Sequence, residues 1–267
     1  MIEFLLLIET VIISTIMYLY LIHKTKINKK FLFIDNIIVI TFSFALTFIL
    51  YLSTKFNYSV LYFLIAGLLV ITDGFALTMI RFWRTPNRKL KAKENELISP
   101  ADGNIIYIKR IEKGETPISI KNGLSITLNE LTKTTLLNSP CWLIGINMTP
   151  FDVHKNCSPI EGEVILNEHF DGKFLSLKNT DALTQNERQT IVIKNNVSKI
   201  GIVQTASRLV RRIDSYVKKG DIIKKGEWYG MIRFGSQVDL IIPIDYTVNV
   251  NLKQQVYAVK TIIAFKN

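Results

Sequence analysis

The sequence predicts a mainly β domain, antiparallel or mixed in its pairing and folded as a sandwich or barrel, preceded by N-terminal transmembrane helices. Three observations predict this fold class. Long apolar runs fill the first 80 residues, short segments rich in Ile, Val, Leu and Thr follow residue 103, and glycine-containing turns separate those segments. We therefore expect a transmembrane anchor over 1–80, a basic interfacial linker over 81–98 and a β-rich domain over 99–267.

Residues 2–22, 33–53 and 59–80 are each long and apolar enough to cross a membrane as a helix. Each run has about 20 residues, which matches a hydrocarbon core of about 30 Å. The runs raise the mean hydropathy of the 267-residue chain to +0.24. Glu9 and Asp73 lie within these runs, so we expect each to find a partner in the helix bundle or to lie at the headgroup level.

The distribution of basic residues predicts how the chain is oriented. Four lysines lie in 23–32 and six basic residues lie in 81–93, whereas Lys55 is the basic residue between the second and third runs. By the positive-inside rule, the amino terminus lies outside the cell membrane and everything after residue 80 is cytoplasmic. The first run lacks the basic start and the cleavage site of a signal peptide, so we expect it to be retained.

The part after residue 80 has 28 basic and 18 acidic residues and so carries a net charge of +10. Next to a bilayer, each nearby Lys or Arg contributes about 1 kcal/mol of attraction to anionic lipid. Anionic membrane lipids are therefore expected partners, with Phe82 and Trp83 as headgroup-level anchors. Nucleic acid is not expected, because no nucleic-acid-binding motif accompanies the charge.

The β-rich part begins with the turn Ser99-Pro-Ala-Asp-Gly103, which leaves the carboxylate of Asp102 open to a chemical role. A short helix is expected around 207–217. Residues 216–235 contain regularly spaced glycines with basic turns between them, a rhythm similar to lipoyl-type β domains, although no lysine stands in a lipoyl-attachment context. Strands are expected at 104–111, 118–128, 141–148, 162–167, 189–195, 199–207 and 248–265.

The Gly235–Ser236 peptide bond lies between two apolar, strand-like runs, which would hold a hydroxyl-bearing junction at a bend. The Ser236 hydroxyl can attack the Gly235 carbonyl and turn the amide into an ester, because glycine has no Cβ to block the approach. Removal of the Ser236 α-proton then breaks the Cβ–O bond of the ester by β-elimination, with the carboxylate of Gly235 as the leaving group. Hydrolysis of the enamine releases ammonia and leaves a pyruvoyl group at position 236. For the dipeptide alone, an ordinary strand–turn–strand is the alternative.

Cys141 and Cys157 lie in the part predicted to face the reducing cytoplasm, so no disulfide is expected. His154 and Cys157 have the spacing of half a metal site. No second pair of ligands follows, and the chain has three histidines in all, so no metal is expected.

Several stretches together resemble the phosphatidylserine decarboxylases, in particular the short, membrane-anchored proteobacterial and archaeal branch of that family. They occur in the family's order over roughly residues 81–245. The stretches are Phe82-Trp-Arg-Thr-Pro86, Ser99-Pro-Ala-Asp-Gly103, Met148-Thr-Pro-Phe-Asp-Val-His-Lys-Asn156 with Pro159 and Gly162, His169-Phe-Asp-Gly-Lys-Phe174, Asn186-Glu-Arg188, and Arg211-Arg-Ile through Arg233-Phe-Gly-Ser-Gln-Val-Asp239.

This resemblance implies a proenzyme that cleaves itself at Gly235–Ser236 into a β chain, 1–235, and an α chain, 236–267, which stay together as a heterodimer. The pyruvoyl group formed from Ser236 would be a covalent cofactor. It would form a Schiff base with phosphatidylserine and accept electrons as CO2 leaves, giving phosphatidylethanolamine. Asp102 and His154 match motif positions of the family and are the expected acid–base residues. We expect His154 to titrate near neutrality, and Asp102 either to orient a base or to act as one.

The chain departs from larger bacterial members, which have a second histidine where this sequence has Cys157. The base that activates Ser236 is therefore open, with His169 as an alternative. Two other functions also stay open: a decarboxylase of another serine-headgroup lipid, such as an archaetidylserine-like lipid, and a non-enzymatic membrane adaptor with a lipoyl-like β domain.

Overall fold

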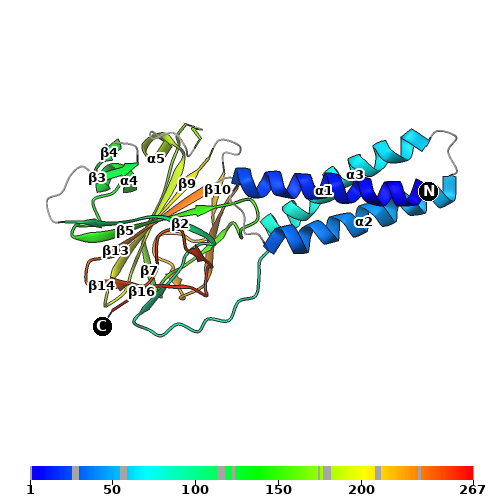
Figure 1. Ribbon diagram of the computed structural model, residues 1–267. Helices are drawn as coiled ribbons and strands as arrows, with labels where there is room; N and C mark the ends of the chain where they lie inside the picture. The colour runs from blue at the N-terminus through cyan, green and yellow to red at the C-terminus, as the bar shows by residue number, and fades with distance from the viewer. Residues whose placement is uncertain are drawn as a thin grey trace. The chain divides into compact units, whose positions relative to one another are not determined.

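The computed structural model describes residues 2–25, 30–54, 59–112, 118–121, 124–173, 175–176, 182–207, 212–233 and 236–266 (Figure 1). The chain divides into two compact units, Met1–Arg84 and Thr85–Asn267.

The described residues of the first unit form long helices that each contain a candidate membrane span. The spans are Ile2–His23, Phe33–Thr54 and Ser59–Trp83, in agreement with the predicted apolar runs. Because these helices are apolar over a length that can cross a bilayer, the first unit associates with a membrane. The helices are α1 (Ile2–Thr25), α2 (Lys30–Thr54) and α3 (Ser59–Trp83).

Polar side chains in this unit pair between helices. Ser43 donates a 2.7 Å hydrogen bond to Asp73, which confirms the expected partner of that carboxylate. Asp35 is fully buried and forms an ion pair with Arg81. The Oε2 atom of Glu9 is buried with no hydrogen-bond partner among the described residues. The partners of Asp73 and Asp35 lower the free-energy cost of placing these two acids within an apolar bundle.

The second unit is built on a large antiparallel sheet. Its order among the described strands is β11-β7-β8-β9-β13-β5-β2-β15, so β13 lies near the middle, between β9 and β5. The strands, in chain order, are β2 (Gly103–Ile111), β5 (Cys141–Met148), β7 (Gly162–Phe170), β8 (Arg188–Lys194), β9 (Lys199–Ala206), β11 (Ile222–Ile223), β13 (Ser236–Pro243) and β15 (Gln255–Val256).

Smaller elements cover this large sheet. One small sheet has the order β1-β16-β14 and another has the order β10-β12-β6, while β3 and β4 form a hairpin. Their bounds, with those of the two short helices, are β1 (Glu96–Ile98), β3 (Ile118–Lys121), β4 (Leu124–Ile126), α4 (Leu128–Thr132), β6 (Lys155–Cys157), α5 (Ala182–Gln185), β10 (Ile213–Ser215), β12 (Trp228–Ile232), β14 (Tyr246–Val248) and β16 (Ile262–Lys266).

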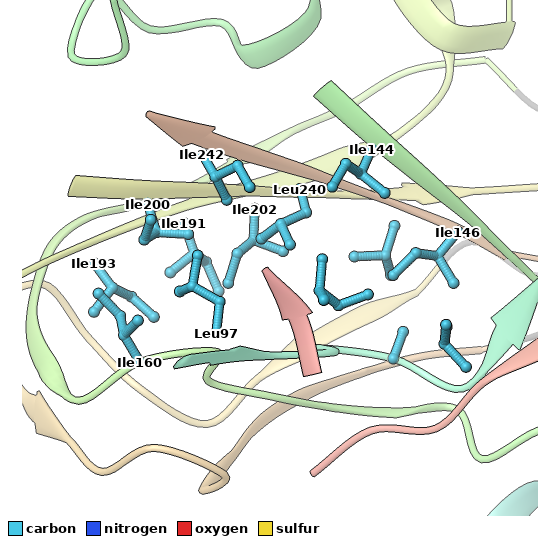
Figure 2. Packing of buried hydrophobic residues seen from close by; sticks show 14 of the residues in the cluster. Leu97, Ile144, Ile146, Ile160, Ile191, Ile193, Ile200, Ile202, Leu240 and Ile242 are labelled. Atoms are coloured by element: carbon cyan, nitrogen blue, oxygen red, sulfur yellow. The ribbon is translucent and has the colours of Figure 1, made fainter. Parts of the chain in front are cut away.

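Alternating side chains give the large sheet two buried faces. Leu240 and Ile242 of β13 belong to the larger core, which also contains Leu97 of β1 and Tyr229 of β12, whereas Ile241 belongs to a second core with residues of α4. Figure 2 shows residues of the larger core, with side chains from β5, β8, β9 and β13 packed together. The predicted fold class, a β-rich part after apolar helices, is confirmed.

Three local expectations differ from the structure. The run 248–265 is interrupted between β14, β15 and β16, where Lys253 takes a left-handed φ of 66° in a turn. The run 118–128 is a hairpin followed by α4, whose start is fixed by a capping box between Thr127 and Glu130. Within 207–217, residues Ile213–Ser215 form strand β10 and not a helix, because they pair with β12.

The predicted basic turns within 216–235 are present. Gly220 and Gly226 have φ values of 95° and 83°, which glycine adopts without strain. Each follows two lysines and precedes an acid whose carboxylate accepts a hydrogen bond from the first lysine's backbone N–H, at 2.7 Å and 2.9 Å. Strand β11, between the two turns, belongs to the large sheet, whereas β12, after the second turn, belongs to a small sheet.

Candidate active site

One edge of the large sheet brings together the ends of four adjacent strands. At this edge β13 and β2 begin, while β5 and β9 end. Ser236, the first residue of β13, is paired with Met148 of β5 on one side and Ala206 of β9 on the other. We call this row of strand ends the junction edge; here and below, an edge of the sheet means the ends of its strands and not an outermost strand. Gly235 lies outside the described residues, and the side chain of Ser236 does as well.

Asp102 lies at the junction edge, immediately before β2. Its carboxylate is 1% exposed and is held by the guanidinium of Arg88, whose Nη2 donates to Oδ2 at 2.7 Å. The backbone N–H of Ala258 donates to Oδ1 at 2.8 Å. Gly103 follows with a φ of 152°, and a Cβ there would lie 2.4 Å from the carbonyl oxygen of Asn147. Glycine thus lets this loop approach the end of β5.

The segment after β5, which carries Asp152 and His154, begins with a turn. The Asp152 backbone N–H donates to the Thr149 carbonyl at 2.9 Å. The Asp152 carboxylate in turn accepts from the N–H and the hydroxyl of Thr149, both at 2.8 Å, and from Gln255 at 3.1 Å. Burial raises the pKa of Asp152, and the nearby Asp102 raises it further.

His154 is fully buried beside the strand that leads to the junction, since its carbonyl accepts a 3.1 Å hydrogen bond from the N–H of Ile232. Its Nδ1 lies 3.0 Å from the carbonyl oxygen of Asp152. Burial lowers the pKa of His154 to about 4. The expectation that this histidine titrates near neutrality is therefore wrong, because its surroundings disfavour the charged form.

Two amide side chains join the loops of the junction edge. Asn156 donates to the carbonyl of Pro100 at 3.4 Å, and its Oδ1 accepts a 2.7 Å hydrogen bond from Gln204 of β9. Next to it, the thiol of Cys157 donates to the Ser99 carbonyl at 3.3 Å. Burial raises the pKa of Cys157 to about 12, so this residue is a neutral thiol and a poor base.

The Asn186-Glu-Arg188 stretch, which leads into β8, lies beside Ala206, the last residue of β9. The backbone N–H of Ala206 donates to the Glu187 carbonyl at 2.9 Å, and the Asn186 amide donates to the Ala206 carbonyl at 2.9 Å. His169 lies at the end of β7, with Nε2 3.5 Å from both Asp171 and Glu187. Strands β8 and β9 separate β7 from β13, so His169 does not adjoin the strand that Ser236 begins.

The junction edge also has buried oxygens to receive a further group. Gln204 Oε1 and Thr205 Oγ1, within two residues of Ala206, are buried without a hydrogen-bond partner among the described residues. Such atoms in a native core call for a partner: the Thr205 hydroxyl can donate to a carbonyl oxygen, whereas Gln204 Oε1 only accepts and would need a donor. The described residues contain no cluster of three or more His, Cys, Asp or Glu suited to a metal ion.

Sequence reasoning missed several residues of this edge. Arg88 was assigned to an interfacial linker, yet it forms an ion pair with Asp102. Gln204 and Gln255 lie on predicted strands, and nothing in their local sequence marks them as partners of Asn156 and Asp152.

The chain matches the family described as phosphatidylserine decarboxylase over residues 75–264. It is 38% identical over 185 residues to a protein of Methanocaldococcus jannaschii provisionally named archaetidylserine decarboxylase proenzyme, covering 69% of this chain and 88% of that one. It is 36% identical over 186 residues to the phosphatidylserine decarboxylase proenzyme of Cytophaga hutchinsonii, and 34% identical over 185 residues to that of Burkholderia ambifaria. These matches cover 69% of this chain and 75% and 77% of the relatives.

The fold and the junction edge define a membrane-associated β-sheet protein with acids, a histidine and amides buried around the first residue of a central strand. The matches cover 88% and 75% of the length of two of these relatives. The chain belongs to the phosphatidylserine decarboxylase family.

Proposed function

We propose that this chain is a phosphatidylserine decarboxylase proenzyme, which cleaves itself at Gly235–Ser236 and then removes CO2 from the serine headgroup of phosphatidylserine. The family match carries this proposal, because it spans both sides of the junction and all strands of the junction edge. The product is phosphatidylethanolamine.

The fold is suited to keep both products of cleavage together. The smaller product, 236–267, contains β13, which pairs along its length with β5 and along most of it with β9. Its Ala258 N–H and Gln255 side chain also bond to Asp102 and Asp152 of the larger product. Separating the two would expose core residues such as Val238 and Leu240, which are fully buried. The two chains therefore form the functional heterodimer.

The hydrogen bonding of His154 favours it as the base. A carbonyl oxygen only accepts, so the Nδ1 atom facing the Asp152 carbonyl carries the ring proton. Nε2 is then the nitrogen that takes up a proton, from the Ser236 hydroxyl during cleavage. The low pKa of His154 leaves Nε2 unprotonated at physiological pH, and the same shift makes the ring a weaker base than an exposed histidine.

Asp102 has an orienting role in this proposal. Both of its oxygens accept from Arg88, and one also accepts from Ala258, so the carboxylate fixes the linker and the small chain against the start of β2. Of the two roles that the sequence leaves open, orientation is favoured over proton transfer, since Arg88 and the Ala258 N–H both donate hydrogen bonds to the carboxylate oxygens.

A pyruvoyl group at position 236 supplies an electron-accepting carbonyl that reacts with the amine of the substrate. Among the described residues, Gln204 lies on the same face of β9 as Ala206, the partner of residue 236, and Thr205 lies on the opposite face; both have a buried oxygen without a hydrogen-bond partner there. Thr205 has a hydroxyl that donates to a carbonyl, and the Gln204 amide, already bonded to Asn156, is held in place.

The experiment that tests this function compares the parental full-length protein with Ser236→Ala, both purified from membranes. The parent is expected to give two pieces with the masses of 1–235 and 236–267 and to release CO2 from phosphatidylserine vesicles. Ser236→Ala is expected to stay as one 30.6 kDa chain without activity. An uncut Ser236→Ala protein that functions fully in cells would favour the membrane adaptor instead.

A second candidate substrate follows from the relatives. Two relatives, 38% and 37% identical, are provisionally named archaetidylserine decarboxylase proenzymes. Their named lipid has the same serine headgroup, so the same junction chemistry would act on it. Parallel assays on vesicles of phosphatidylserine and of the archaeal-type ether lipid separate the two; a higher kcat/KM on the ether lipid would overturn our choice.

We further propose that the second unit works on the cytoplasmic face of the cell membrane, near anionic lipids. The positive charge of the chain after residue 80 and the clustered basic residues at 81–93 support this placement. Protease treatment of inverted vesicles is expected to degrade the second unit, whereas intact spheroplasts are expected to protect it.

A further inference from the structure

A buried polar cluster lies on the face of the large sheet that carries the second core. Tyr107 of β2 donates a hydrogen bond from its hydroxyl to Asp239 of β13. Gln237 donates from Nε2 to the Tyr107 hydroxyl at 2.8 Å and to the two Asp239 oxygens at 2.9 and 3.0 Å. The exposed fractions of Tyr107, Gln237 and Asp239 are 7%, 3% and 0%. We call these three residues the β13 anchor.

The anchor spans three strands, and Gly145 makes this possible. Gly145 of β5 is paired with Tyr107 of β2 on one side and with Asp239 of β13 on the other. A Cβ at Gly145 would lie between 2.4 and 2.7 Å from atoms of the Tyr107 ring. The ring therefore crosses over β5, in the space that the missing side chain leaves, to reach β13.

The β13 anchor is costly to the fold. A buried carboxylate loses several kcal/mol of hydration free energy, and nearby core positions such as Leu143, Val192 and Val203 are apolar. Arg188, 1% exposed, adds a second buried charge on this face, although its Nη1 donates to the Leu131 carbonyl at 3.0 Å. An apolar trio would pack this face at lower cost, so stability alone does not account for the anchor.

The position of the anchor along the chain suggests its use. Gln237 and Asp239 are the second and fourth residues of the small chain that cleavage would create at Ser236. Although β13 is paired on both sides from Ser236 onward, cleavage would remove its covalent link to residue 235, and a new chain end frays more readily than a continuous strand. Side chains that fix Gln237 and Asp239 to Tyr107, a residue of the large chain, oppose such fraying.

We propose that Tyr107, Gln237 and Asp239 are positioning residues, which hold the first residues of β13 in register for self-cleavage and keep the new amino end in place afterwards. The proposal rests on the proposed function, since it requires a cut before Ser236. None of the three acts on the substrate in this account. Their effect reaches the reaction through the position of residue 236, where small displacements cost rate steeply.

The test compares Tyr107→Phe with Tyr246→Phe in the full-length protein. Both variants remove one buried tyrosine hydroxyl that is hydrogen-bonded, to Asp239 in the first case and to Ser198 in the second. Ser198 directly precedes β9 and so lies at the opposite edge of the large sheet. We expect Tyr107→Phe to slow self-cleavage about tenfold and to lower kcat of the cleaved enzyme with KM unchanged. Tyr246→Phe is expected to match the parent in both rates.

Equal cleavage rates and equal kcat for the two tyrosine variants would overturn the proposal. A parent that is never cut would instead refute the proposed function itself. A second measurement needs no variant: hydrogen exchange of the cleaved parental enzyme is expected to protect the amides of 237–239 as strongly as those of 240–242. Fast exchange confined to 237–239 would show that the anchor does not hold the new end.

Discussion

The two edges of the large sheet differ in what they bury. At the junction edge, charged and polar side chains are enclosed, with Asp102 and His154 at 1% and 0% exposure. At the opposite edge the molecule is hollowed. A cavity of about 260 Å³ is lined by Lys199 and Pro243, among others, and one of about 1130 Å³ by Ile222 and Lys225, among others.

The two cavities and the buried polar groups of the candidate site therefore lie at opposite edges of the large sheet. Large cavities are the usual first place to look for a ligand site, yet these two lie where strands carry exposed lysines and apolar side chains such as Ile222, 73% exposed. Asp152 and His154, whose pKa values are shifted by burial, lie at the other edge, although Cys141 and Lys225 beside the cavities have shifted pKa values as well. If the chemistry belongs to the junction edge, substitutions at the two edges will have unequal effects.

The largest expected effect is that of His154→Gln. If His154 is the base, as we propose, its loss is expected to lower the self-cleavage rate by about 10²–10⁴-fold. A matched change at the other edge, Lys199→Gln, removes a side chain that bonds to the Leu136 carbonyl and is expected to leave cleavage unchanged. Cleavage is followed on gels over time. Equal rates for His154→Gln and the parent would show that another group is the base.

Breaking the ion pair at the junction edge is expected to cost stability as well as rate. Arg88→Gln leaves the buried Asp102 carboxylate without its cation, which typically costs about 3–5 kcal/mol. Thermal unfolding of the detergent-solubilised protein should show a lower midpoint. The exposed pair of Arg110 and Glu112 serves as control, because Arg110→Gln should change stability by less than about 1 kcal/mol. Equal losses for both would show that burial of the first pair is unimportant.

As pH falls, protonation of His154 and protonation of Asp239 are expected to change the stability of the fold in opposite directions. Burial lowers the pKa of His154 from 6.5 to about 4, so its contribution to stability is lost as pH falls from about 6.5 to 4. Burial raises the pKa of Asp239 from 3.8 to about 6 despite its bonds to Tyr107 and Gln237 and the charge of Arg188. The native state thus binds the extra proton, and stability falls as pH rises from about 4 to 6.

Each of these two terms is on the order of 3 kcal/mol, and they partly cancel in the parent. Asp239→Asn should therefore steepen the loss of stability on acidification, whereas His154→Gln should reverse the slope between pH 4 and 6. Unfolding midpoints measured across pH 4–7 check both signs. Parallel curves for the two variants would contradict these protonation states.

The smallest effect is expected at the edge of the large sheet that has the two cavities, opposite the junction edge. Ile222→Ser changes a side chain that is already mostly in solvent, so stability should shift by less than about 0.5 kcal/mol and kcat should not change. A large loss of activity in Ile222→Ser would show that this edge takes part in the reaction and would end the contrast between the two edges.

Much of the fold could be predicted from the sequence, because the helices and strands depend on local patterns of apolar residues. Apolar runs of membrane length and alternating segments such as 141–148 and 199–207 set the elements directly. The capping box of Thr127 and Glu130 can also be recognised in the sequence and indicates the start of α4. The interruptions in 248–265 depend on turns whose residues resemble those of the flanking strands.

The candidate site was less accessible. Motif resemblance led to Asp102 and His154, but not to what surrounds them, because their partners are distant in sequence. Arg88 reaches Asp102 from the linker, and Tyr107 lies 132 residues from Asp239. The pKa of His154 depends on burial, which no local pattern encodes.

The central claim is that this polypeptide makes its own reactive carbonyl from Ser236. Mass spectrometry of the mature protein, digested around position 236, tests it most directly. The account predicts a small chain that starts at residue 236 with a keto-acyl group and no free amine. An active preparation in which Gly235 and Ser236 are still joined would contradict it.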